Sequence, residues 1–453
     1  MERIRLSEHF NYKKLIKFVM PSVVMMVFLS VYSIIDGFFV SNFAGELPFA
    51  ALNLIFPLIM ILGSVGFMLG TGGNAVVSKL LGEKNNDRAN RIFSMLIYVT
   101  IAIGLALALI GMLVVRPVAE LFASMEENIT SEERAQLVEY CVVYARIIFM
   151  ALPAFMIQNA FQGFFVTAEK ARLGLYVTIA AGLANIILDA LFVAVFRWGL
   201  VGAAVATALS QCVGGVLPLF YFFRKNDSLL RLTKTRFEGK VFAGVCVNGS
   251  SELLTNISLS MVSILYNAQL MKYIGIRGVS AYGIMMYIGF IFIAMFIGYA
   301  VGVAPIVGYH YGAENRDELK NILKKSVCIF GVLGILMTAV SIIFSTALSS
   351  IFAGNDAELL SIASRGFRLY SLCFLLSGFN IFASSFFTAL SNGTLSLIIS
   401  FFRTFLCQAA AVMLLPLWLG VDGIWLATAI AELVALFLSV TLILCQKKRY
   451  GYL

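Results

Sequence analysis

The feature that most constrains this chain is its series of long, uninterrupted apolar stretches. Many run for roughly 20 residues or more, which is the length that a helix needs to cross a bilayer. Lipid accepts only helices and closed barrels, because every backbone N–H and C=O must be paired within the protein. Barrel strands would instead give segments of roughly 10 residues with alternating polarity. The sequence therefore predicts an all-α integral membrane protein.

Composition supports this prediction. Of the 453 residues, 60% are hydrophobic and 13% are charged, and the mean hydropathy is +0.93. A soluble protein carries charge on roughly a quarter of its residues. Twelve apolar spans are predicted, at 15–40, 49–79, 92–116, 137–166, 172–196, 199–223, 241–271, 278–308, 322–347, 360–390, 395–417 and 420–445. The first span lacks a small-residue cleavage site, so we expect it to remain as a signal anchor.

The distribution of charge predicts the topology. With a cytoplasmic N-terminus, 24 of the 33 Lys and Arg residues fall in the termini and the even-numbered connections. An odd-numbered connection carries Glu126, Glu127, Glu132 and Glu133 instead. This is the positive-inside bias, so we expect a multi-pass membrane protein with both termini cytoplasmic. The net charge of +9 then reflects topology, and no nucleic-acid partner is expected.

Several function classes lack their motifs. The seven cysteines form no CxxC and no Cys/His cluster, so neither disulfides, metal thiolates nor cofactors are expected. There is no HExxH or GxSxG motif, which argues against an enzyme, and no selectivity-filter repeat, which argues against a channel. His310, at the end of an apolar span, is interpreted as structural.

An internal repeat relates the two halves. Gly199–Ala208 matches Gly420–Ala429, and at the same offset Phe165 and Thr167 match Phe386 and Thr388. Six spans separate the copies, so both halves face the same way, as in a two-lobed transporter with its substrate between the lobes. We predict an N-terminal six-helix lobe at 1–223, a basic cytoplasmic linker at 224–240 and a C-terminal six-helix lobe at 241–453.

Three acids stand out within the apolar spans, namely Asp36, Asp189 and Glu252. A carboxylate at the bilayer centre costs about 2.5–3.5 kcal/mol on insertion scales, so each is a functional candidate. Helical spacing places Tyr32 beside Asp36 and Asn185 beside Asp189. The same spacing pairs Asn159 with Gln162, and places Asn256 with Glu252 on one polar stripe. The alternative, polar side chains that only hold helices together, stays open, above all for the amides.

Other residues within the spans suggest movement and packing. Pro21 lies fifteen residues before Asp36 and removes a helix hydrogen bond, which permits a bend. Methionines such as Met285 are dense and would suit a cavity for lipophilic cations, although ordinary apolar packing explains any single one equally well. Arg146 and Arg403 are interpreted as structural partners for carbonyls or acids, since arginine does not readily release its proton.

The sequence resembles the multidrug and toxic compound extrusion (MATE) transporters, in particular their bacterial DinF/MepA-like branch. The resemblance covers essentially the whole chain, and the segments that carry it are Tyr32–Val40, Asn185–Phe192, Gly199–Thr207, Tyr144–Ile147 and Ala304–Gly308. It implies a V-shaped pair of six-helix lobes that exports organic cations by alternating access, in exchange for H⁺ or Na⁺.

The resemblance also implies site residues. A cation-coupling site would consist of Tyr32, Asp36, Asn185, Asp189 and Thr207, of which the last four could supply Na⁺ ligands. The substrate cavity is expected to involve Asn159, Gln162, Glu252, Asn256 and Met285, with Pro21 as the hinge. Glu252 departs from this branch and resembles the seventh-span acid of other MATE branches, which leaves the coupling ion and a second coupling site open.

The alternative function is a flippase of lipid-linked oligosaccharides from the same wider superfamily. A flippase should carry a strongly basic central groove for pyrophosphate, whereas the arginines within these spans are few. We expect a monomer whose partners are the bilayer and small lipophilic cations. The sequence leaves the individual substrate open.

Overall fold

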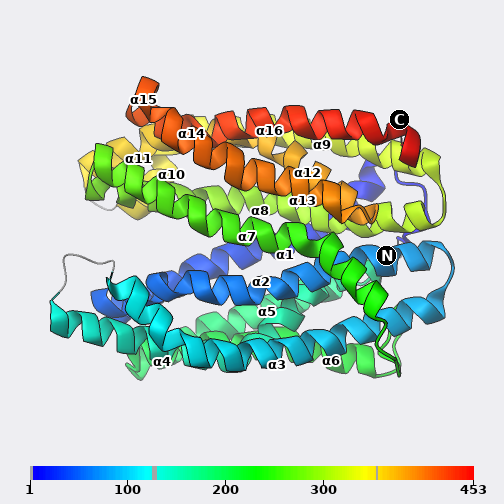
Figure 1. The fold of residues 1–453 in the computed structure, drawn as a ribbon, viewed down its shortest axis with the longest axis horizontal. Coiled ribbons are helices and arrows are strands. Elements are labelled where there is room, and N and C mark those ends of the chain that lie inside the picture. The colour runs from blue at the N-terminus through cyan, green and yellow to red at the C-terminus, as the bar shows by residue number, and fades with distance from the viewer. Residues whose placement is uncertain (1–3, 125–129, 354–355, 453) are drawn as a thin grey trace. The chain divides into compact units, whose positions relative to one another are not determined.

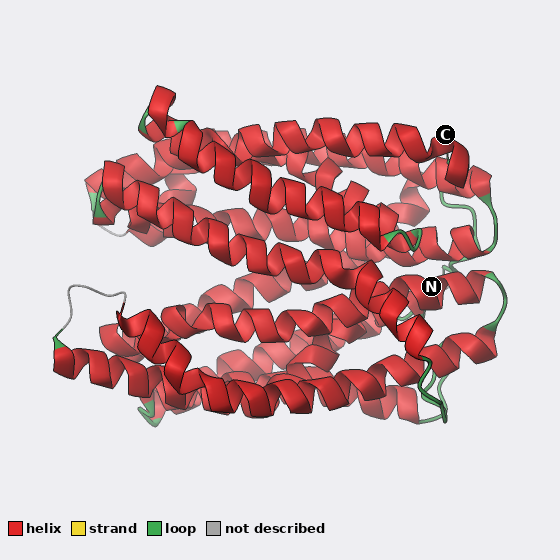
Figure 2. Cartoon of the chain, in the orientation of Figure 1, coloured by secondary structure: helices red, strands yellow, loops and turns green. Residues whose placement is uncertain are grey.

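The computed structural model describes residues 4–124, 130–353 and 356–452, and these ranges contain helices and connecting loops but no strand (Figures 1 and 2). The α-helices are α1 (Tyr12–Phe39), α2 (Glu46–Gly82), α3 (Asn86–Ser124), α4 (Ser131–Thr167), α5 (Ala171–Asp189), α6 (Gly199–Phe223), α7 (Gly239–Tyr273), α8 (Ile276–Gly312), α9 (Arg316–Ile343), α10 (Ser345–Ala353), α11 (Ala357–Tyr370), α12 (Phe374–Ala389), α13 (Gly393–Phe401), α14 (Gln408–Leu414), α15 (Pro416–Leu419) and α16 (Val421–Tyr450). Three π-helical segments follow α1, α5 and α13, at Val40–Ala44 (η1), Ala190–Val195 (η2) and Phe402–Cys407 (η4), and a 3₁₀ turn, Ser371–Cys373 (η3), joins α11 to α12.

The predicted spans correspond to these helices. Within the described residues, eleven helical segments are long and apolar enough to cross a membrane. The predicted span at 241–271 forms α7, which is 35 residues long but is not among these eleven. The prediction of an all-helical membrane protein is confirmed, and each of the twelve predicted spans coincides with helix.

Large apolar side chains on the outer surface explain why this fold needs lipid. Leu113 is 80% exposed, Ile343 72% and Phe437 69%, on α3, α9 and α16 respectively. Soluble proteins rarely expose contiguous apolar surface on this scale, whereas lipid chains solvate it without cost.

The chain divides into two compact units. The N-terminal unit comprises Phe28–Val77 and Asn85–Gly249, and the C-terminal unit comprises Met1–Val27, Ser78–Lys84 and Ser250–Leu453. The divisions therefore fall inside α1, α2 and α7. The lobe boundaries expected from the repeat, at 223 and 241, stay a prediction.

Aromatic side chains join α3, α4 and α6 in the N-terminal unit. The ring of Phe93 lies edge-on to Phe164 at 4.9 Å and to Phe222 at 5.2 Å, and Phe161 stacks on Phe222 at 5.4 Å between centroids. Such pairs add stability beyond the apolar area that they bury. They fix the three helices that support the polar residues of this unit.

The loop after α6 is bound to the same unit. The backbone N–H of Arg231 donates to Oδ1 of Asn90 at 2.8 Å, and that of Thr233 donates to Oγ of Ser94 at 2.8 Å. The basic segment 224–240, which the sequence predicted as a linker, is therefore attached to α3 along part of its length.

The acidic connection before α4 lies partly within the described residues. Glu126 and Glu127 lie outside them, whereas Glu132 and Glu133 form the first turn of α4. Thr130 and Glu133 make a capping box, in which Oε2 of Glu133 accepts from the backbone N–H of Thr130 at 2.9 Å. This satisfies N–H groups that the first turn of a helix leaves unpaired.

The C-terminal unit has an aromatic cluster of its own around Phe330 of α9. That ring lies 4.9 Å from Tyr299 and 5.7 Å from Phe296 of α8, and 5.4 Å from Phe382 of α12. Phe296, Tyr299 and Phe330 are almost fully buried. The cluster binds α8, α9 and α12 into one core.

Backbone conformation repeats between the two halves. Gly199 and Gly420, which are equivalent in the sequence repeat, both have positive φ (56° and 58°), and they begin α6 and precede α16 respectively. Lys84 (φ 59°) and Glu314 (φ 54°) make the same left-handed turn at equivalent positions, each just after the last residue of α2 or α8. The two copies of the sequence repeat therefore share their connecting turns as well as their helices.

Glycines of α8 allow the first part of α1 to approach closely. A Cβ at Gly298 would lie 2.6 Å from Cα of Val23, and one at Gly302 would lie 2.9 Å from Cβ of Val19. Backbone cannot yield to such contacts as a flexible side chain can. These positions therefore require glycine for the α1–α8 contact.

We expect Gly298→Ala to destabilise the C-terminal unit by about 1–3 kcal/mol, since the added methyl group overpacks α8 against the backbone of α1. The matched control is Gly283→Ala in the same helix, where no heavy atom lies within 4 Å of the added Cβ. That change should be neutral or stabilising by roughly 0.5–1 kcal/mol, because alanine favours a helix. Thermal unfolding in detergent measures both, and equal Tm values for the two variants would contradict the packing argument.

Candidate functional site

Glycines and a π-helical segment bring α1, α5 and α6 together in the N-terminal unit. A Cβ at Gly182 of α5 would lie 2.5 Å from the ring of Phe28 and 3.0 Å from that of Tyr32, both on α1. A Cβ at Gly202 of α6 would lie 3.0 Å from the backbone of Phe192 in η2. The three helices therefore approach one another at the depth of the predicted polar residues.

Four of the predicted coupling residues meet at this junction. Oγ1 of Thr207 on α6 donates to Oδ1 of Asp36 on α1 at 3.3 Å. The side chains of Asn185 and Asp189, both on α5, also interact with the carboxylate of Asp36. Tyr32 lies one turn before Asp36 and experiences its charge. The family resemblance implied this grouping, and Tyr32 joins the four other residues in the structure. Their role in coupling stays a prediction.

Asp189 has an unusual environment. It is fully buried, and Asn185 is 1% exposed. Although both interact electrostatically with Asp36, neither the carboxylate of Asp189 nor the amide of Asn185 makes a hydrogen bond of normal geometry with any described residue. A buried carboxylate without hydrogen bonds is costly unless it is neutralised. The site therefore favours a bound proton or a small cation.

The end of α5 determines where Asp189 points. Asp189 is the last residue of α5, and η2 begins directly after it. A π-helical segment inserts an extra residue per turn and redirects the side chains around it, and such segments are frequent at functional sites. Nothing in the apolar pattern of this span predicts a π-helical segment.

Tyr144 is a further member of the site that sequence reasoning missed. It lies on α4, is 5% exposed and interacts electrostatically with both Asp36 and Asp189. In the sequence, Tyr144 belongs to a segment that supports the family resemblance, and no role at this site was predicted for it. A buried tyrosine in an apolar span is ordinary by itself, so only its proximity to two acids marks it.

The predicted substrate-cavity residues are divided between the two units. On α4, Nε2 of Gln162 donates to Oδ1 of Asn159 at 3.4 Å, and both side chains are buried. Glu252, Asn256 and Met285 belong to the C-terminal unit, where Asn256 donates to the backbone carbonyl of Glu252 at 2.9 Å. Met285 is 1% exposed and lies next to Gly366. Their assignment to a substrate cavity stays a prediction.

The C-terminal unit contains an acid that sequence reasoning also missed. Glu432 of α16 is 3% exposed and forms an ion pair with Arg403 of η4, with 3.7 Å between Oε1 and Nη1. Its position inside the twelfth apolar span could have revealed it. Arg403 thus has the acidic partner expected of it, whereas Arg146 is exposed on α4.

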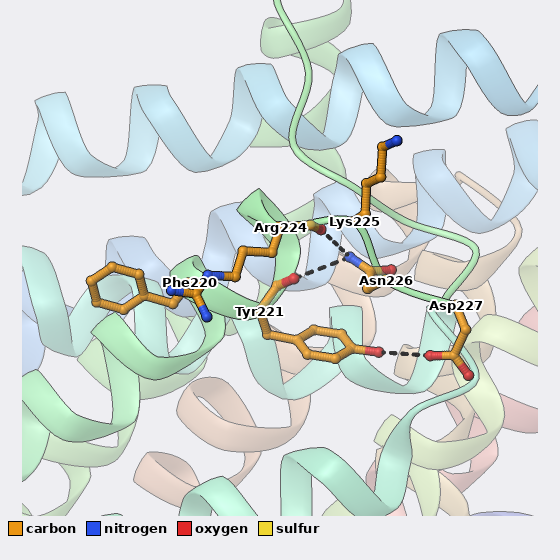
Figure 3. Close-up of a pocket in the computed structure, with 6 residues that line it drawn as sticks. All are labelled: Phe220, Tyr221, Arg224, Lys225, Asn226 and Asp227. Carbon is orange, nitrogen blue, oxygen red and sulfur yellow. Dashed lines mark hydrogen bonds between the residues drawn. The ribbon is translucent and has the colours of Figure 1, made fainter.

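A surface pocket at the end of α6 is separate from the acids. It has a volume of about 660 Å³ and is lined by Phe220, Tyr221, Arg224, Lys225, Asn226 and Asp227 (Figure 3). Phe220 follows Thr207 by 13 residues, roughly 20 Å along a helix. This pocket is open and peripheral, and the chemistry of the buried carboxylates lies elsewhere.

The donor set of the N-terminal site suits a monovalent cation. Among the described residues, no group of three or more His, Cys, Asp or Glu side chains could hold a metal ion. The site instead offers two carboxylates, an amide oxygen and a hydroxyl group. Hard cations prefer oxygen ligands, so Na⁺ fits this set, as does a proton shared by the carboxylates.

The described fold has close counterparts among solved structures. A MATE protein crystallised in complex with MaL6 aligns with a TM-score of 0.89 at 20% identity, over 99% of this chain and 100% of that chain. An outward-facing multidrug resistance MATE family transporter of the MOP superfamily aligns with a TM-score of 0.88 at 22% identity, over 99% of each chain. At these identities the similarity establishes the two-lobed fold.

Sequence comparison supports the same relationship. The chain is 23% identical to the multidrug export protein MepA of Staphylococcus saprophyticus, over 92% of this chain and 89% of that protein. It is 22% identical to MepA of Staphylococcus haemolyticus, over 97% and 94%. Residues 21–191 and 253–413, well over half of the chain, match the MatE family. The resemblance read from the motifs is thus confirmed, and this multi-pass membrane protein belongs to the MatE family, whose members are transporters and not enzymes.

Proposed function

We propose that this protein exports organic cations from the cell in exchange for H⁺ or Na⁺, by alternating access. The observation that carries the proposal is the pair of acids in the N-terminal unit, half-buried Asp36 and fully buried Asp189, together with Asn185 and Thr207. The names of the relatives, multidrug export proteins, support export of drugs. Burial in lipid makes an unneeded acid costly, so two acids in one place favour a functional role.

Exchange follows from the charges of the pair. The carboxylates of Asp36 and Asp189 interact electrostatically, and two negative charges at one site repel each other. Protons or Na⁺ from outside would relieve this repulsion, and their loss to the cytoplasm would restore it. A membrane potential of about 100 mV supplies roughly 2.3 kcal/mol for each charge moved, enough to drive a useful substrate gradient.

Movement of α1 would connect ion binding to the substrate. The first part of α1 packs on Gly298 and Gly302 of α8, whereas Tyr32 and Asp36 in its last part pack on α5 and α6. Pro21 lies within the first part and removes one backbone hydrogen bond. When Asp36 is neutralised, the interactions that hold the last part of α1 against α5 and α6 change. A bend at Pro21 would then reshape the cavity and release the drug outward.

Paired amides, flexible methionines and acids within the spans bear on the substrate class. The paired amides Asn159 and Gln162 could orient a polar group of a bound drug, and flexible methionines could accommodate its apolar body. Acidic residues within the spans favour cationic over anionic substrates. We therefore propose small lipophilic cations, transported by a monomer in the bacterial plasma membrane.

The orientation follows from the positive-inside rule and is open to test. Single cysteines introduced in the basic segment 224–240 should react with an impermeant maleimide only from the cytoplasmic side, whereas cysteines at Glu132 or Glu133 should react only from outside. Native cysteines are first replaced by serine or alanine. The reverse labelling pattern would overturn both the orientation and the proposed direction of transport.

Glu252 is predicted to be a second coupling residue. If so, Glu252→Gln should lower drug efflux from proteoliposomes, or shift its pH optimum, because glutamine keeps the shape but cannot bind a proton. Ser260→Ala is a suitable control two turns further along α7, since it removes a hydroxyl group that donates to the backbone carbonyl of Asn256. Unchanged activity and pH optimum of Glu252→Gln, at equal expression, would leave Glu252 a structural residue.

Asp36 and Asp189 are predicted to act as one coupling unit. Asp36→Asn and Asp189→Asn keep volume and hydrogen-bonding capacity but remove the charge, so each should abolish gradient-driven ethidium efflux. Loss of about 2.3 kcal/mol per ion at 100 mV corresponds to a roughly 50-fold smaller gradient. The double variant should be no worse than either single one, because residues that act together are not additive.

The measurement uses proteoliposomes with separately imposed pH and Na⁺ gradients, which also identifies the coupling ion. Each variant must first be shown to be folded, by size-exclusion chromatography and Tm. Uphill export by Asp189→Asn at the wild-type level would exclude the proposed site.

A further inference from the structure

Glu432, an acid within the last apolar span, is paired on both of its carboxylate oxygens. Its Oε2 accepts a hydrogen bond from Nδ2 of Asn380 at 2.7 Å, and Nη1 of Arg403 lies 3.7 Å from its Oε1. Oγ of Ser439 donates to Oδ1 of Asn380 at 2.7 Å, which fixes the orientation of that amide. Asn380 and Ser439 are buried as completely as Glu432. The transport proposal uses none of these four residues.

The sequence repeat relates this cluster to the N-terminal site. At the offset that pairs Gly199 with Gly420, Asn380 corresponds to Asn159 and Glu432 corresponds to Gln211. Thr428 likewise corresponds to Thr207, and its hydroxyl is bonded to the hydroxyl of Tyr266 at 2.7 Å. The C-terminal repeat therefore keeps the polar positions of the N-terminal one, but places a carboxylate where that one has an amide.

Arg403 is the second difference between the copies. It corresponds to Ala181 when α5 and α13 are aligned at their first residues, and to Gly182 at the offset that relates α6 to α16. In the N-terminal unit this position must be small, because Phe28 and Tyr32 of α1 lie against it. The C-terminal repeat instead carries a guanidinium group there, directed to Glu432.

We propose that Arg403 is a fixed internal cation of the C-terminal repeat, and that it holds the charge of Glu432 permanently balanced. In the N-terminal repeat the carboxylates are balanced by a cation from solution, whereas in the C-terminal repeat Arg403 supplies the balancing charge. Arginine keeps its charge at every physiological pH, so the pair cannot exchange protons with the medium. Glu432 and Arg403 are positioning residues in this arrangement, and the exchangeable charge near them is left to Glu252.

The surrounding groups are consistent with this arrangement. Glu252 of α7 is half-buried and lies within electrostatic range of Arg403. Besides Arg403, the described titratable side chains that interact electrostatically with Glu432 are Tyr370 of α11, Cys373 of η3 and Cys407 of η4, none of which can carry a positive charge. Tyr266 of α7 and Tyr282 of α8 interact in turn with Tyr370. Glu252 and Glu432 both interact with the guanidinium group of Arg403, but Glu432 is the one that forms an ion pair with it.

Cation binding to the purified protein tests the proposal without measuring transport. Arg403→Gln removes the internal cation, so the variant should take up one more monovalent cation per molecule than the wild type. One arm measures proton uptake by titration in Na⁺-free buffer, and the other measures ²²Na⁺ binding at constant alkaline pH. Adding Glu432→Gln to Arg403→Gln should return the count to the wild-type value. Arg365→Gln, which removes a guanidinium from the exposed pair with Asp422, is the matched control and should leave the count unchanged.

Thermal stability identifies the partner of Arg403. Arg403→Gln and Glu432→Gln should each lower Tm, and the double variant should recover most of the loss, because it leaves no unpaired buried charge. Glu252→Gln should show no such recovery when combined with Arg403→Gln. If Arg403→Gln is too unstable to purify, recovery of folded protein in the Arg403→Gln/Glu432→Gln variant alone supports the pair.

An unchanged cation count in folded Arg403→Gln overturns the proposal. So does recovery of stability by Glu252→Gln in place of Glu432→Gln, or a double variant no more stable than Arg403→Gln. The inference rests on the proposed function only in expecting that an unbalanced carboxylate here can reach an exchangeable cation. A protein that fails to export drugs could still pass this test, and an active exporter could still fail it, so the two failures are distinguishable.

Discussion

The absence of water inside a bilayer is the constraint on which the rest of this structure depends. A polar group in a membrane-embedded helix must find a partner within the protein, and a charge must be balanced by another charge, a proton or a bound ion. The long helices meet the first requirement for the backbone, because each N–H and C=O group within a helix is paired inside that helix. The second demand explains why buried charges of the described spans gather around Asp36 and Asp189 in one unit and around Glu432 and Arg403 in the other.

The two groups meet that demand in different ways. The N-terminal unit collects carboxylates, an amide and a hydroxyl, but no cationic side chain is recorded as a partner of the carboxylates among the described residues. The C-terminal unit places Arg403 against Glu432 and completes the pair with Asn380. One fold repeated twice can thus present one group whose charge depends on the medium and another whose charge is largely internal. Such a difference would let one half of a transporter respond to ions while the other stays constant.

Close helix contacts make these groups possible. Gly182 lets α1 lie against α5, and Gly298 and Gly302 let the first part of α1 lie against α8. Since lipid gives no hydrophobic drive for helices to associate, tight packing at small residues is an important part of what holds them together. Side-chain additions at these glycines would separate the helices that carry the polar groups. Packing and chemistry therefore depend on the same few positions.

The sequence by itself determined the all-helical membrane fold and the internal repeat, because hydropathy and the match between the two halves can be read from the chain alone. It marked Asp36, Asn185, Asp189 and Thr207 through the cost of polar groups in apolar spans and through family motifs. It missed Tyr144, whose relevance is its distance to two acids on other helices. It also missed Glu432, and it left the acid that pairs with Arg403 unnamed. Only the tertiary structure decided those pairings, since a charge's partner depends on which helices pack together, and one apolar span does not specify its neighbours.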